Sequence, residues 1–266
     1  MFETKYLYTI KNGEFSIQQN FFVEFKNEYF DSGTFRNCYK GIIVNKYRKK
    51  VKTKDFKTGD CVVKVPKNKN GNYNYKIDFI CSEYANSLAQ KYNKEVAKIP
   101  DKLNFILPYG TELDIFEGEK GIVSVEPYLE GKYIKFYNND GAPGQKYKSL
   151  TAYTHYTWKE NEGKRVITDI QGIKENNKFY LTDPAIQSIE GKYGESDLGV
   201  QGLIKFLLFH KCNDICREWR WIEIDKYFKL TNYEKASIRF TKYSFQQAKN
   251  EKYLPIYIKL LELIGF

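Results

Sequence analysis

The sequence predicts an α+β fold in two lobes, with a strand-rich first lobe and a mixed second lobe. Short apolar and aromatic stretches separated by Gly, Asn and Lys recur through the first half, and one helical pattern interrupts them. The second half alternates helical patterns with short strands. A chain of 266 residues with 42% apolar residues is long enough to build both lobes, and ligands often bind at such domain interfaces.

The first half is expected to hold five strands and one helix. The strands are predicted over residues 14–23, 39–44, 60–65, 104–107 and 121–125. The helix is predicted over residues 76–92, because its apolar side chains follow one another in steps of three and four. These side chains belong to Ile77, Ile80, Tyr84, Leu88 and Tyr92.

The second half is expected to contain helices over residues 149–158 and 198–210, with a strand pair between them at 165–172 and 178–181. Residues beyond 222 also read as helical. We therefore predict a first lobe over 1–127, a second lobe over 128–222, and a helical extension over 223–266 that packs on or near the second lobe.

Charge and the lack of long apolar runs narrow the class of protein. The net charge of +10 suits anionic partners such as nucleotide phosphates, nucleic acid or an acidic protein, without choosing among them. No apolar run reaches the length that spans a bilayer, and the first fifteen residues lack the apolar core of a signal peptide. We expect a cytoplasmic protein with no membrane partner, in which the five cysteines stay reduced.

A metal-ligand pattern lies near residue 210. His210, Cys212 and Cys216 form the pattern H-x-C-x3-C, and His155 is the only other histidine of the chain. Four such ligands would complete the closed tetrahedral shell of a structural Zn²⁺ and leave no position for a catalytic water. The alternative is two buried thiols and two ordinary histidines.

The first half also carries basic residues in places that suit an anion. Lys64 lies within an apolar strand, where an unpaired charge is costly, so it requires a phosphate or an acidic side chain as partner. Asp78, one turn into the predicted helix, is the best acidic candidate. Arg36 follows a glycine turn that could lay its guanidinium across phosphates. Each feature alone is equally compatible with an exposed charge.

Hard oxygen ligands gather in the second half. Asp169 and Gln171 are two residues apart, so in an extended chain they would face the same side. Asp183 follows the next strand, and Pro184 ends it. Carboxylate and amide oxygens suit Mg²⁺, and a glycine loop from Gly194 to Gly199 precedes a helix that could cradle an anion or a peptide. The alternative is turn aspartates and an ordinary helix N-cap at Ser196 or Asp197.

Taken in order, these motifs resemble the alpha-kinase family of atypical protein kinases, which includes elongation factor 2 kinase, the myosin heavy chain kinases and the kinase domains of melastatin-type channels. The similarity runs from about residue 32 to residue 219. Seven co-linear segments carry it: Val125 to Lys135, Tyr137 to Gly141, Thr154 to Thr157, Asp169 to Gly172, Leu181 to Pro184, Asp197 to Gly199 and His210 to Cys216. The segment between Gly172 and Leu181 is a few residues longer than the family pattern.

The resemblance implies a protein-kinase-like two-lobed fold and a role for each matching residue. Asp169 would be the catalytic aspartate, with Asp183 and Lys64 also in the catalytic set. ATP would be bound by Arg36, Lys64, Asp78, Glu126 at the adenine, Lys135, Asn139, Gln171 and Asp183. Gln171 and Asp183 would hold Mg²⁺, and Gly194 and Gly199 would bound a loop that faces the peptide. The zinc ligands would be His155, His210, Cys212 and Cys216.

The activity that this resemblance implies is transfer of the γ-phosphate of Mg-ATP to Ser or Thr hydroxyls of a protein substrate, with autophosphorylation. These residues supply the parts that phosphoryl transfer needs. Two other readings remain open. A zinc-stabilised nucleic-acid-binding module, the less favoured, would leave Asp169, Gln171 and Asp183 without a role, and a scaffold would keep the fold without turnover. The sequence does not predict the protein substrate, the activator or the oligomeric state.

Overall fold

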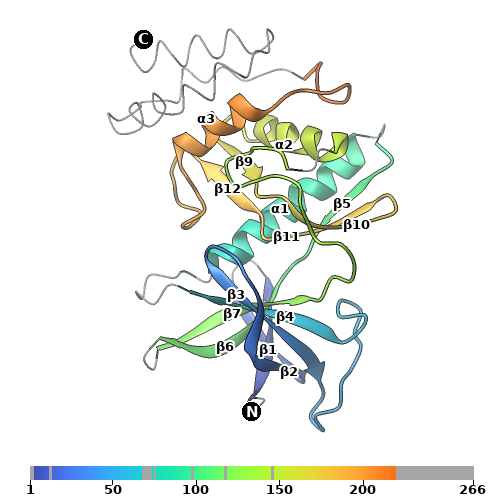
Figure 1. Ribbon diagram of the computed structural model, residues 1–266, viewed down its shortest axis with the longest axis vertical. Coiled ribbons are helices and arrows are strands. Elements are labelled where there is room, and N and C mark those ends of the chain that lie inside the picture. The colour runs from blue at the N-terminus through green and yellow to red at the C-terminus, as the bar shows by residue number, and fades with distance from the viewer. Residues whose placement is uncertain are drawn as a thin grey trace. The chain divides into compact units, whose positions relative to one another are not determined.

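The computed structural model describes residues 3–11, 14–67, 74, 76–96, 99–116, 119–144 and 147–219 (Figure 1). The described residues divide into two compact units. The first is drawn from Met1–Asn86 and Phe105–Gly131, and the second from Ser87–Asn104 and Lys132–Phe266. The predicted extension over 223–266 lies outside the described residues. Among the residues described, no helix combines the length and apolarity needed to cross a membrane.

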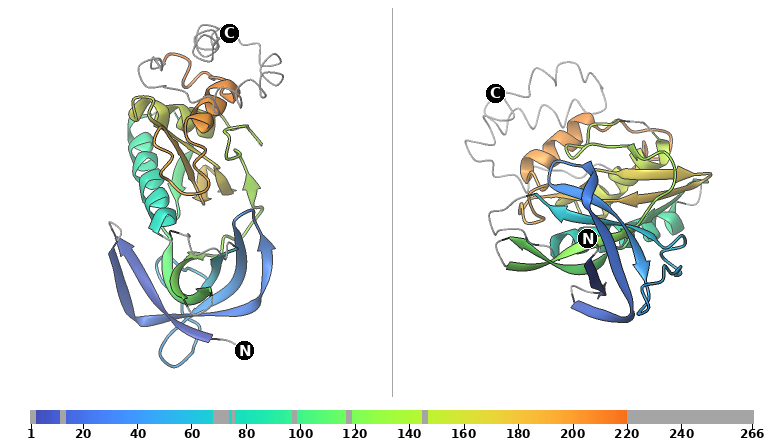
Figure 2. Two further views of the ribbon diagram at one scale, coloured as in Figure 1. Left: turned by 90° about the vertical axis from the view of Figure 1, so that its left-hand side faces the viewer. Right: turned by 60° about the horizontal axis from the view of Figure 1, so that its bottom comes forward.

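The first unit is a closed barrel of six antiparallel strands in the order β1-β2-β3-β4-β7-β6. Its strands are β1 (Glu3–Lys11), β2 (Glu14–Ser32), β3 (Arg36–Val44), β4 (Asp60–Pro66), β6 (Tyr109–Phe116) and β7 (Glu119–Pro127). Tyr8 of β1 pairs with Gly110 of β6 and closes the ring. Figure 2 shows the strong curvature of these strands from two further sides. Closure removes the exposed sheet edges that an open six-stranded sheet would leave.

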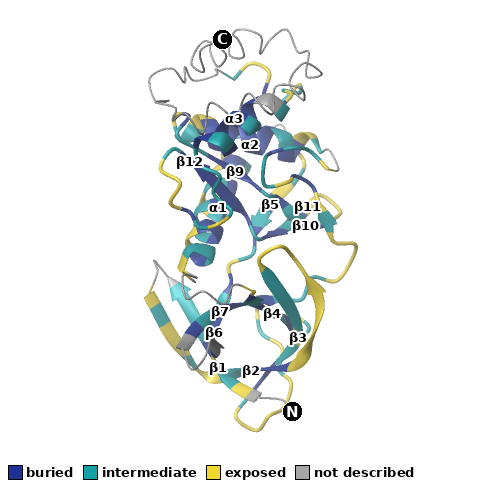
Figure 3. Cartoon of the chain, turned by 60° about the vertical axis from the view of Figure 1, so that its left-hand side comes forward, coloured by how far each residue is buried: buried dark blue, intermediate teal, exposed yellow. Residues whose placement is uncertain are grey.

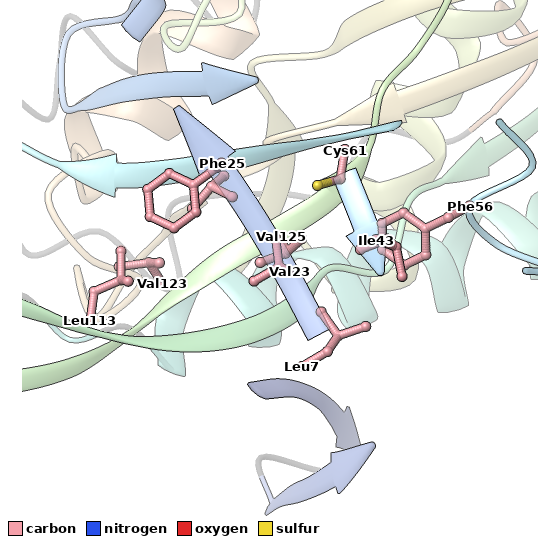
Figure 4. Close-up of a cluster of buried hydrophobic side chains, with 10 residues drawn as sticks. Leu7, Val23, Phe25, Ile43, Phe56, Cys61, Leu113, Val123 and Val125 are labelled. Carbon is pink, nitrogen blue, oxygen red and sulfur yellow. The ribbon is translucent and has the colours of Figure 1, made fainter. Parts of the chain in front are cut away.

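The core of the barrel comes from strand alternation. Every second residue of a strand points to the same face, so pairs such as Val23 and Phe25, or Val123 and Val125, enter the interior together (Figure 4). The full cluster of buried residues is Leu7, Val23, Phe25, Ile43, Phe56, Cys61, Val63, Leu113, Val123 and Val125. The other face of β2 is largely exposed, as the yellow segments in Figure 3 show.

Helix α1 (Lys76–Glu95) contributes residues to both units. Its last turns belong to the second unit because Tyr92 is buried there, where its ring meets Tyr153 and Tyr156 edge to face. The hydroxyl of Tyr92 donates to the carbonyl of Ser149 at 2.8 Å. These contacts tie residues 87–104 to the second unit rather than to the barrel.

The second unit contains two small sheets. One has four strands in the order β5-β11-β10-β8, and the other pairs β12 with β9. The strands are β5 (Lys102–Phe105), β8 (Ile134–Lys135), β9 (Arg165–Thr168), β10 (Gln171–Glu175), β11 (Lys178–Thr182) and β12 (Ala185–Ser188). Every residue of β12 is buried, which places this short strand inside the unit.

Helices α2 (Lys148–Glu160) and α3 (Val200–Phe209) complete the second unit. Nine of the ten positions of α2 from Ser149 to Trp158 are buried, Thr151 being the exception, so this helix lies inside the unit rather than on its surface. The ring of Trp158 meets that of Phe206 on α3 with centroids 5.8 Å apart. Helix α3 lies beside β9 and β12 in Figure 1.

The structure contains all three predicted helices and the five predicted strands of the first half, with longer bounds for most of them. The single strand predicted over 165–172 is wrong. Asp169 has a φ of +51°, which turns the chain and divides the segment into β9 and β10 in different sheets. The pair predicted with 178–181 therefore forms only through β10, whereas β9 pairs with β12. Strands β1, β6, β8 and β12 were not predicted.

Candidate functional site

The first unit carries a cluster of charged side chains on the side of the sheet opposite to its core. Cys61 and Val63 point into the core, so Lys64 lies on the other face of β4. The antiparallel register sets Cys38 opposite Lys64 and Arg36 opposite Pro66, which brings Arg36 to the same face. We call Arg36, Lys64, Asp78 and Glu126 the charged cluster.

Two ion pairs hold the charged cluster together. The Nζ of Lys64 lies 2.6 Å from Oε2 of Glu126, and both side chains are buried. β7 brings Glu126 there because it sets that residue opposite Val62, diagonal to Lys64. Arg36 donates from Nη1 to Oδ2 of Asp78 at 3.1 Å. The structure thus gives Lys64 a carboxylate partner from a strand, and Asp78, the acid predicted for that lysine, contacts Arg36.

Two buried opposite charges on adjacent strands suit an anion-binding lysine. A buried ammonium requires a counter-charge in the absence of ligand, because its desolvation is not otherwise compensated. Glu126 supplies that counter-charge and fixes where the ammonium lies. Arg36 adds a fork of donors that can contact phosphate oxygens in pairs. The charged cluster is therefore fitted to bind a polyphosphate.

In the second unit, two aspartates lie where the chain passes from one sheet to the other. Thr168 pairs with Ala185 at the end of β9 and β12, and Gln171 pairs with Thr182 at the start of β10 and β11. Between these two ladders each chain segment has two residues: Asp169 with Ile170, and Asp183 with Pro184. The two aspartates therefore face the same gap between the ladders.

Both aspartates have left-handed backbone conformations, with φ of +51° at Asp169 and +49° at Asp183. Asp and Asn tolerate this region better than other residues that carry a Cβ, although it still costs energy. Such strain clusters at functional sites, where the surrounding structure imposes it. Here both turns end the strands that precede them and place the two aspartates in the opposing two-residue links between the ladders.

Gln171 and Lys135 join this group through the sheet. Gln171 is opposite Thr182 on one side and opposite Lys135 on the other, so the three lie in one row across β8, β10 and β11. The Nζ of Lys135 forms an ion pair with Oδ1 of Asp169 at 2.7 Å. The row therefore places an amide and an ammonium beside the two carboxylates, a donor set that suits Mg²⁺ with anionic oxygens.

Asn139 faces inward to the glycine loop. Its Nδ2 donates to the carbonyl of Ser196 at 2.9 Å, and its Oδ1 accepts from Nε2 of Gln187 at 2.8 Å. Sequence reasoning placed Asn139 near the nucleotide, whereas these bonds connect it to the loop from Gly194 to Gly199. Gln187 is not among the site residues predicted from the sequence. Its only sequence signal is that it is a polar residue in β12, a strand whose residues are all buried.

Asp197 organises the glycine loop from within. Its Oδ1 accepts from the backbone N–H groups of Ser188 and Gly199, both at 2.9 Å. Its Oδ2 accepts from the Ser188 hydroxyl at 2.6 Å and from the N–H of Tyr193 at 3.1 Å. The helix itself begins after Gly199, which has a φ of +63° and no side-chain cap. The N-cap is Gly199, so the alternative of an N-cap at Ser196 or Asp197 is wrong, and Asp197 closes the loop instead.

The histidine and cysteine side chains predicted to bind zinc come together. The ligand atoms of His155, His210, Cys212 and Cys216 all lie within 4.8 Å of one another. Sγ of Cys212 is 3.5 Å from Nδ1 of His155, and Sγ of Cys216 is 3.9 Å from Nε2 of His210. A tetrahedron with metal–ligand bonds of about 2.0–2.3 Å has edges of about 3.3–3.8 Å. The two printed separations are close to these edges, so the four side chains are candidate ligands for a zinc ion.

Burial supports the same interpretation. His155 and His210 are buried, and burial lowers the pKa of His210 below its usual value, which keeps the imidazole neutral and able to bind a metal. The neighbouring thiol of Cys212, followed by burial, raises the pKa of Cys216. Two thiolates so close would repel each other, and a cation at the centre would remove that repulsion.

The family of the chain follows from comparison with known proteins. The sequence profile of the Alpha-kinase family matches residues 31–216, more than half of the chain. Among characterised relatives, Alpha-protein kinase vwkA of Dictyostelium discoideum is 30% identical over 193 residues, which cover 71% of this chain and 30% of the relative. Myosin heavy chain kinase B of the same organism is 30% identical over 71% of this chain and 24% of its own length. The chain thus spans less than a third of these relatives.

Solved structures show the same fold. The alpha-kinase domain of Myosin Heavy Chain Kinase A in complex with AMP superposes with a TM-score of 0.68 at 22% identity, covering 81% of this chain and 97% of that domain. A structure described as a novel alpha kinase from Entamoeba histolytica gives a TM-score of 0.64 at 26% identity and covers 82% and 90%. The chain has the fold of an alpha-kinase domain, and it belongs to the alpha-kinase family of protein kinases.

Proposed function

We propose that this chain is an ATP- and Mg²⁺-dependent protein kinase that phosphorylates Ser and Thr hydroxyls, its own among them. One observation carries the proposal. The crossing between the two ladders of the second unit brings Asp169 and Asp183 into one gap, with Gln171 and Lys135 beside them. A gap with two carboxylates and an amide suits the Mg²⁺-phosphate end of a nucleotide.

The charged cluster of the first unit would bind the phosphates. Lys64 would exchange its contact with Glu126 for contacts to phosphate oxygens, and Arg36 would add a bidentate contact. Glu126 and Asp78 would then position these cations rather than neutralise them fully. AMP, ADP and AMP-PNP are bound in the related Myosin Heavy Chain Kinase A structures, which supports a nucleotide as the ligand here.

Asp169 would orient the attacking hydroxyl. Its carboxylate forms an ion pair with Lys135 and is an acceptor that a hydroxyl could donate to. Gln171 and Asp183 would hold Mg²⁺, which neutralises charge on the phosphates that Asp169 would otherwise repel. The rate gain would come from alignment of hydroxyl and phosphate and from charge stabilisation, the two means that phosphoryl transfer relies on.

The domain limits of 1–127, 128–222 and 223–266 belong to this proposal. So does a role in nucleotide binding for Lys135 and Asn139, and the bond from Asn139 to Ser196 would also connect it to the glycine loop.

The test is transfer of label from γ-labelled ATP with Mg²⁺ to the chain itself and to myelin basic protein, followed by identification of the labelled amino acid. Wild type should label Ser or Thr, and Asp183→Ala should lose the signal. Asp31→Ala is the control, because Asp31 is exposed at the end of β2 and accepts only from the N–H of Ser32 among the described contacts. Label on tyrosine, or full activity in Asp183→Ala, would contradict the assignment. Stabilisation by Mg-ATP without transfer would favour a scaffold.

We further propose that the histidine and cysteine cluster holds a structural Zn²⁺. Four protein donors leave no open coordination position, so the metal would serve folding rather than chemistry. Metal analysis of the purified protein should find about one zinc per chain. A folded protein without bound metal would disprove this part, whatever its activity.

A further inference from the structure

A buried amide connects the glycine loop with the segment that leads to Asp169. Gln187 of β12 is fully buried, with a relative exposure of 0%. Its Nε2 lies 3.0 Å from the carbonyl of Asn139, 2.8 Å from Oδ1 of Asn139, 3.0 Å from the hydroxyl of Thr168 and 3.1 Å from the carbonyl of Ser196. Its Oε1 accepts from the N–H of Leu198 at 2.7 Å. One side chain therefore contacts both the loop and the strand end before Asp169.

The backbone fixes the orientation of this amide. The N–H of Leu198 can only donate, so it must face the oxygen of Gln187. The carbonyls of Asn139 and Ser196 can only accept, so they must face the nitrogen. A carboxylate at position 187 would satisfy Leu198 but would set a negative oxygen against these carbonyls.

The nitrogen has more acceptors than hydrogens. An amide NH₂ carries two protons, yet four oxygens lie within 3.1 Å of it. The nitrogen is therefore satisfied by Asn139 and Thr168 as well as by Ser196 on the loop. The oxygen, in contrast, has one described donor, the N–H of Leu198, and this bond holds the loop to Gln187.

Asp169 is tied to the same group. Its backbone N–H donates to the carbonyl of Asn138 at 3.2 Å, and the neighbouring Thr168 hydroxyl donates to the carbonyl of Asn139 at 2.8 Å. The loop is bonded to Asn139, and Asp169 is bonded to the neighbouring Asn138 and follows Thr168 in the chain. Gln187 contacts Asn139, Thr168 and the loop together.

The amide of Gln187 packs closely against Gly202 of helix α3. A Cβ on Gly202 would lie 2.0 Å from Oε1 of Gln187 and 2.6 Å from its Cδ. Glycine inside a helix is otherwise unfavourable by roughly 1 kcal/mol relative to alanine. The absence of a side chain at Gly202 is thus required by the amide of Gln187 that packs against it.

We infer that Gln187 is a positioning residue, which holds the loop from Gly194 to Gly199 in register with Asp169 so that a protein substrate on that loop presents its hydroxyl to the carboxylate. This rests on the proposed kinase function. It predicts that changes at this contact alter the use of protein substrate rather than of ATP.

The experiment compares Gln187→Glu and Gly202→Ala with wild type, using myelin basic protein as substrate. Gln187→Glu keeps the acceptor for Leu198 and removes the donor, whereas Gly202→Ala displaces an unchanged amide. Both should raise the KM for the protein substrate about tenfold, as expected for lost hydrogen bonds, with KM for ATP within about threefold of wild type. Hydrogen exchange of the peptide covering residues 188–199 should be faster in both variants than in wild type.

Tyr92→Phe is the matched control. Tyr92 is buried in the same unit, and its hydroxyl donates to the carbonyl of Ser149 on helix α2, with no described bond to β9, β12 or the loop. It should lose stability without a change in the KM for protein or in exchange of the loop. Gly202→Ala adds a second safeguard, because it displaces the amide of Gln187 without changing its hydrogen-bonding groups.

The outcomes separate this inference from the proposed function. Unchanged loop exchange, or faster exchange with an unchanged KM for protein, would overturn the inference. If wild type transfers no phosphate, the proposed function fails, and faster exchange confined to the loop would still support Gln187 as the residue that positions it.

Discussion

Replacement of Lys64 by methionine should destabilise the protein strongly, and a second replacement should reverse much of that loss. The side chains of Lys64 and Glu126 are exposed by only 7% and 6%, and their charged atoms lie 2.6 Å apart. Lys64→Met leaves the carboxylate of Glu126 buried without its cation. Removal of one partner from a buried pair typically costs about 3–5 kcal/mol of free energy of unfolding.

The double variant Lys64→Met with Glu126→Leu removes both charges and should recover most of this stability, because apolar replacements of a buried pair are often neutral. At about 2–4 °C per kcal/mol for a chain of this size, the single variant should unfold about 6–20 °C below wild type. Both variants should fail to transfer phosphate, since neither has the cation proposed to bind it.

The pH dependence gives a further check on the single variant. An unpaired buried carboxylate has a raised pKa, so the folded variant binds a proton more readily than the unfolded chain. Its deficit should therefore be smallest below about pH 4 and grow as the pH rises to 8. Thermal and urea unfolding measure the stability of the wild type, the single variant and the double variant. A loss below about 1 kcal/mol, or a double variant less stable than the single one, would refute the reasoning.

Three further predictions concern other parts of the chain. Burial would raise the pKa of Glu24, but hydrogen bonds from Arg48 and Thr4 outweigh burial and lower that pKa. The ionised carboxylate therefore stabilises the folded state at pH values above its unfolded-state pKa. This stability is lost as the pH falls through the lower folded-state pKa. Urea unfolding of Arg48→Met should therefore show a deficit at pH 7 that disappears by about pH 3, and an equal deficit at both would contradict this. Gly172→Ala should destabilise by more than about 2 kcal/mol, because its φ is +145° and a Cβ would lie 2.0 Å from the carbonyl of Tyr180; thermal unfolding checks it, and a neutral effect would show that the hairpin can shift. Removal of the proposed zinc by a strong chelator should expose the buried side chain of Trp158 and change the tryptophan fluorescence of the protein. Added Zn²⁺ should restore the original fluorescence. Unchanged fluorescence after complete metal loss would contradict a folding role.

Much of the fold was predictable because many of its helices and strands have a hydrophobic period that is visible in the local sequence. The apolar periodicity of α1 and the apolar runs of β4 and β7 predicted these elements. The predicted stripe of α1 is wrong as its buried face, because Ile80 is exposed and the buried side chains are those of Phe79, Cys81, Ser82, Ala85, Ala89 and Tyr92. Strands such as β12 escaped prediction because four residues after a proline are too few to establish any period. An element is predictable where its own residues show the hydrophobic period of a helix or strand. It is not predictable where only pairing with a distant segment makes it a strand.

The candidate site was predictable in its residues but less so in its contacts. The histidine and cysteine cluster was predicted because few residue types bind zinc and the chain has only two histidines. The contact of Lys64 with Glu126 was not predicted, because it arises through the register of β4 with β7 between residues sixty-two positions apart. The same holds for Asp169, whose positive φ depends on the two ladders on either side of it rather than on neighbouring residues.

The crossing between the two ladders also explains why the longer segment after Gly172 need not disturb the site. The β10–β11 hairpin is anchored at the crossing, where Gln171 pairs with Thr182, and its turn lies at the other end, past Glu175 and Lys178. A hairpin that grows by one residue on each strand adds its new pair at the distal end and leaves the register at the crossing unchanged. Length in this hairpin is therefore free to vary between relatives, whereas a single residue inserted between Leu181 and Asp183 would turn the carboxylate away from its gap.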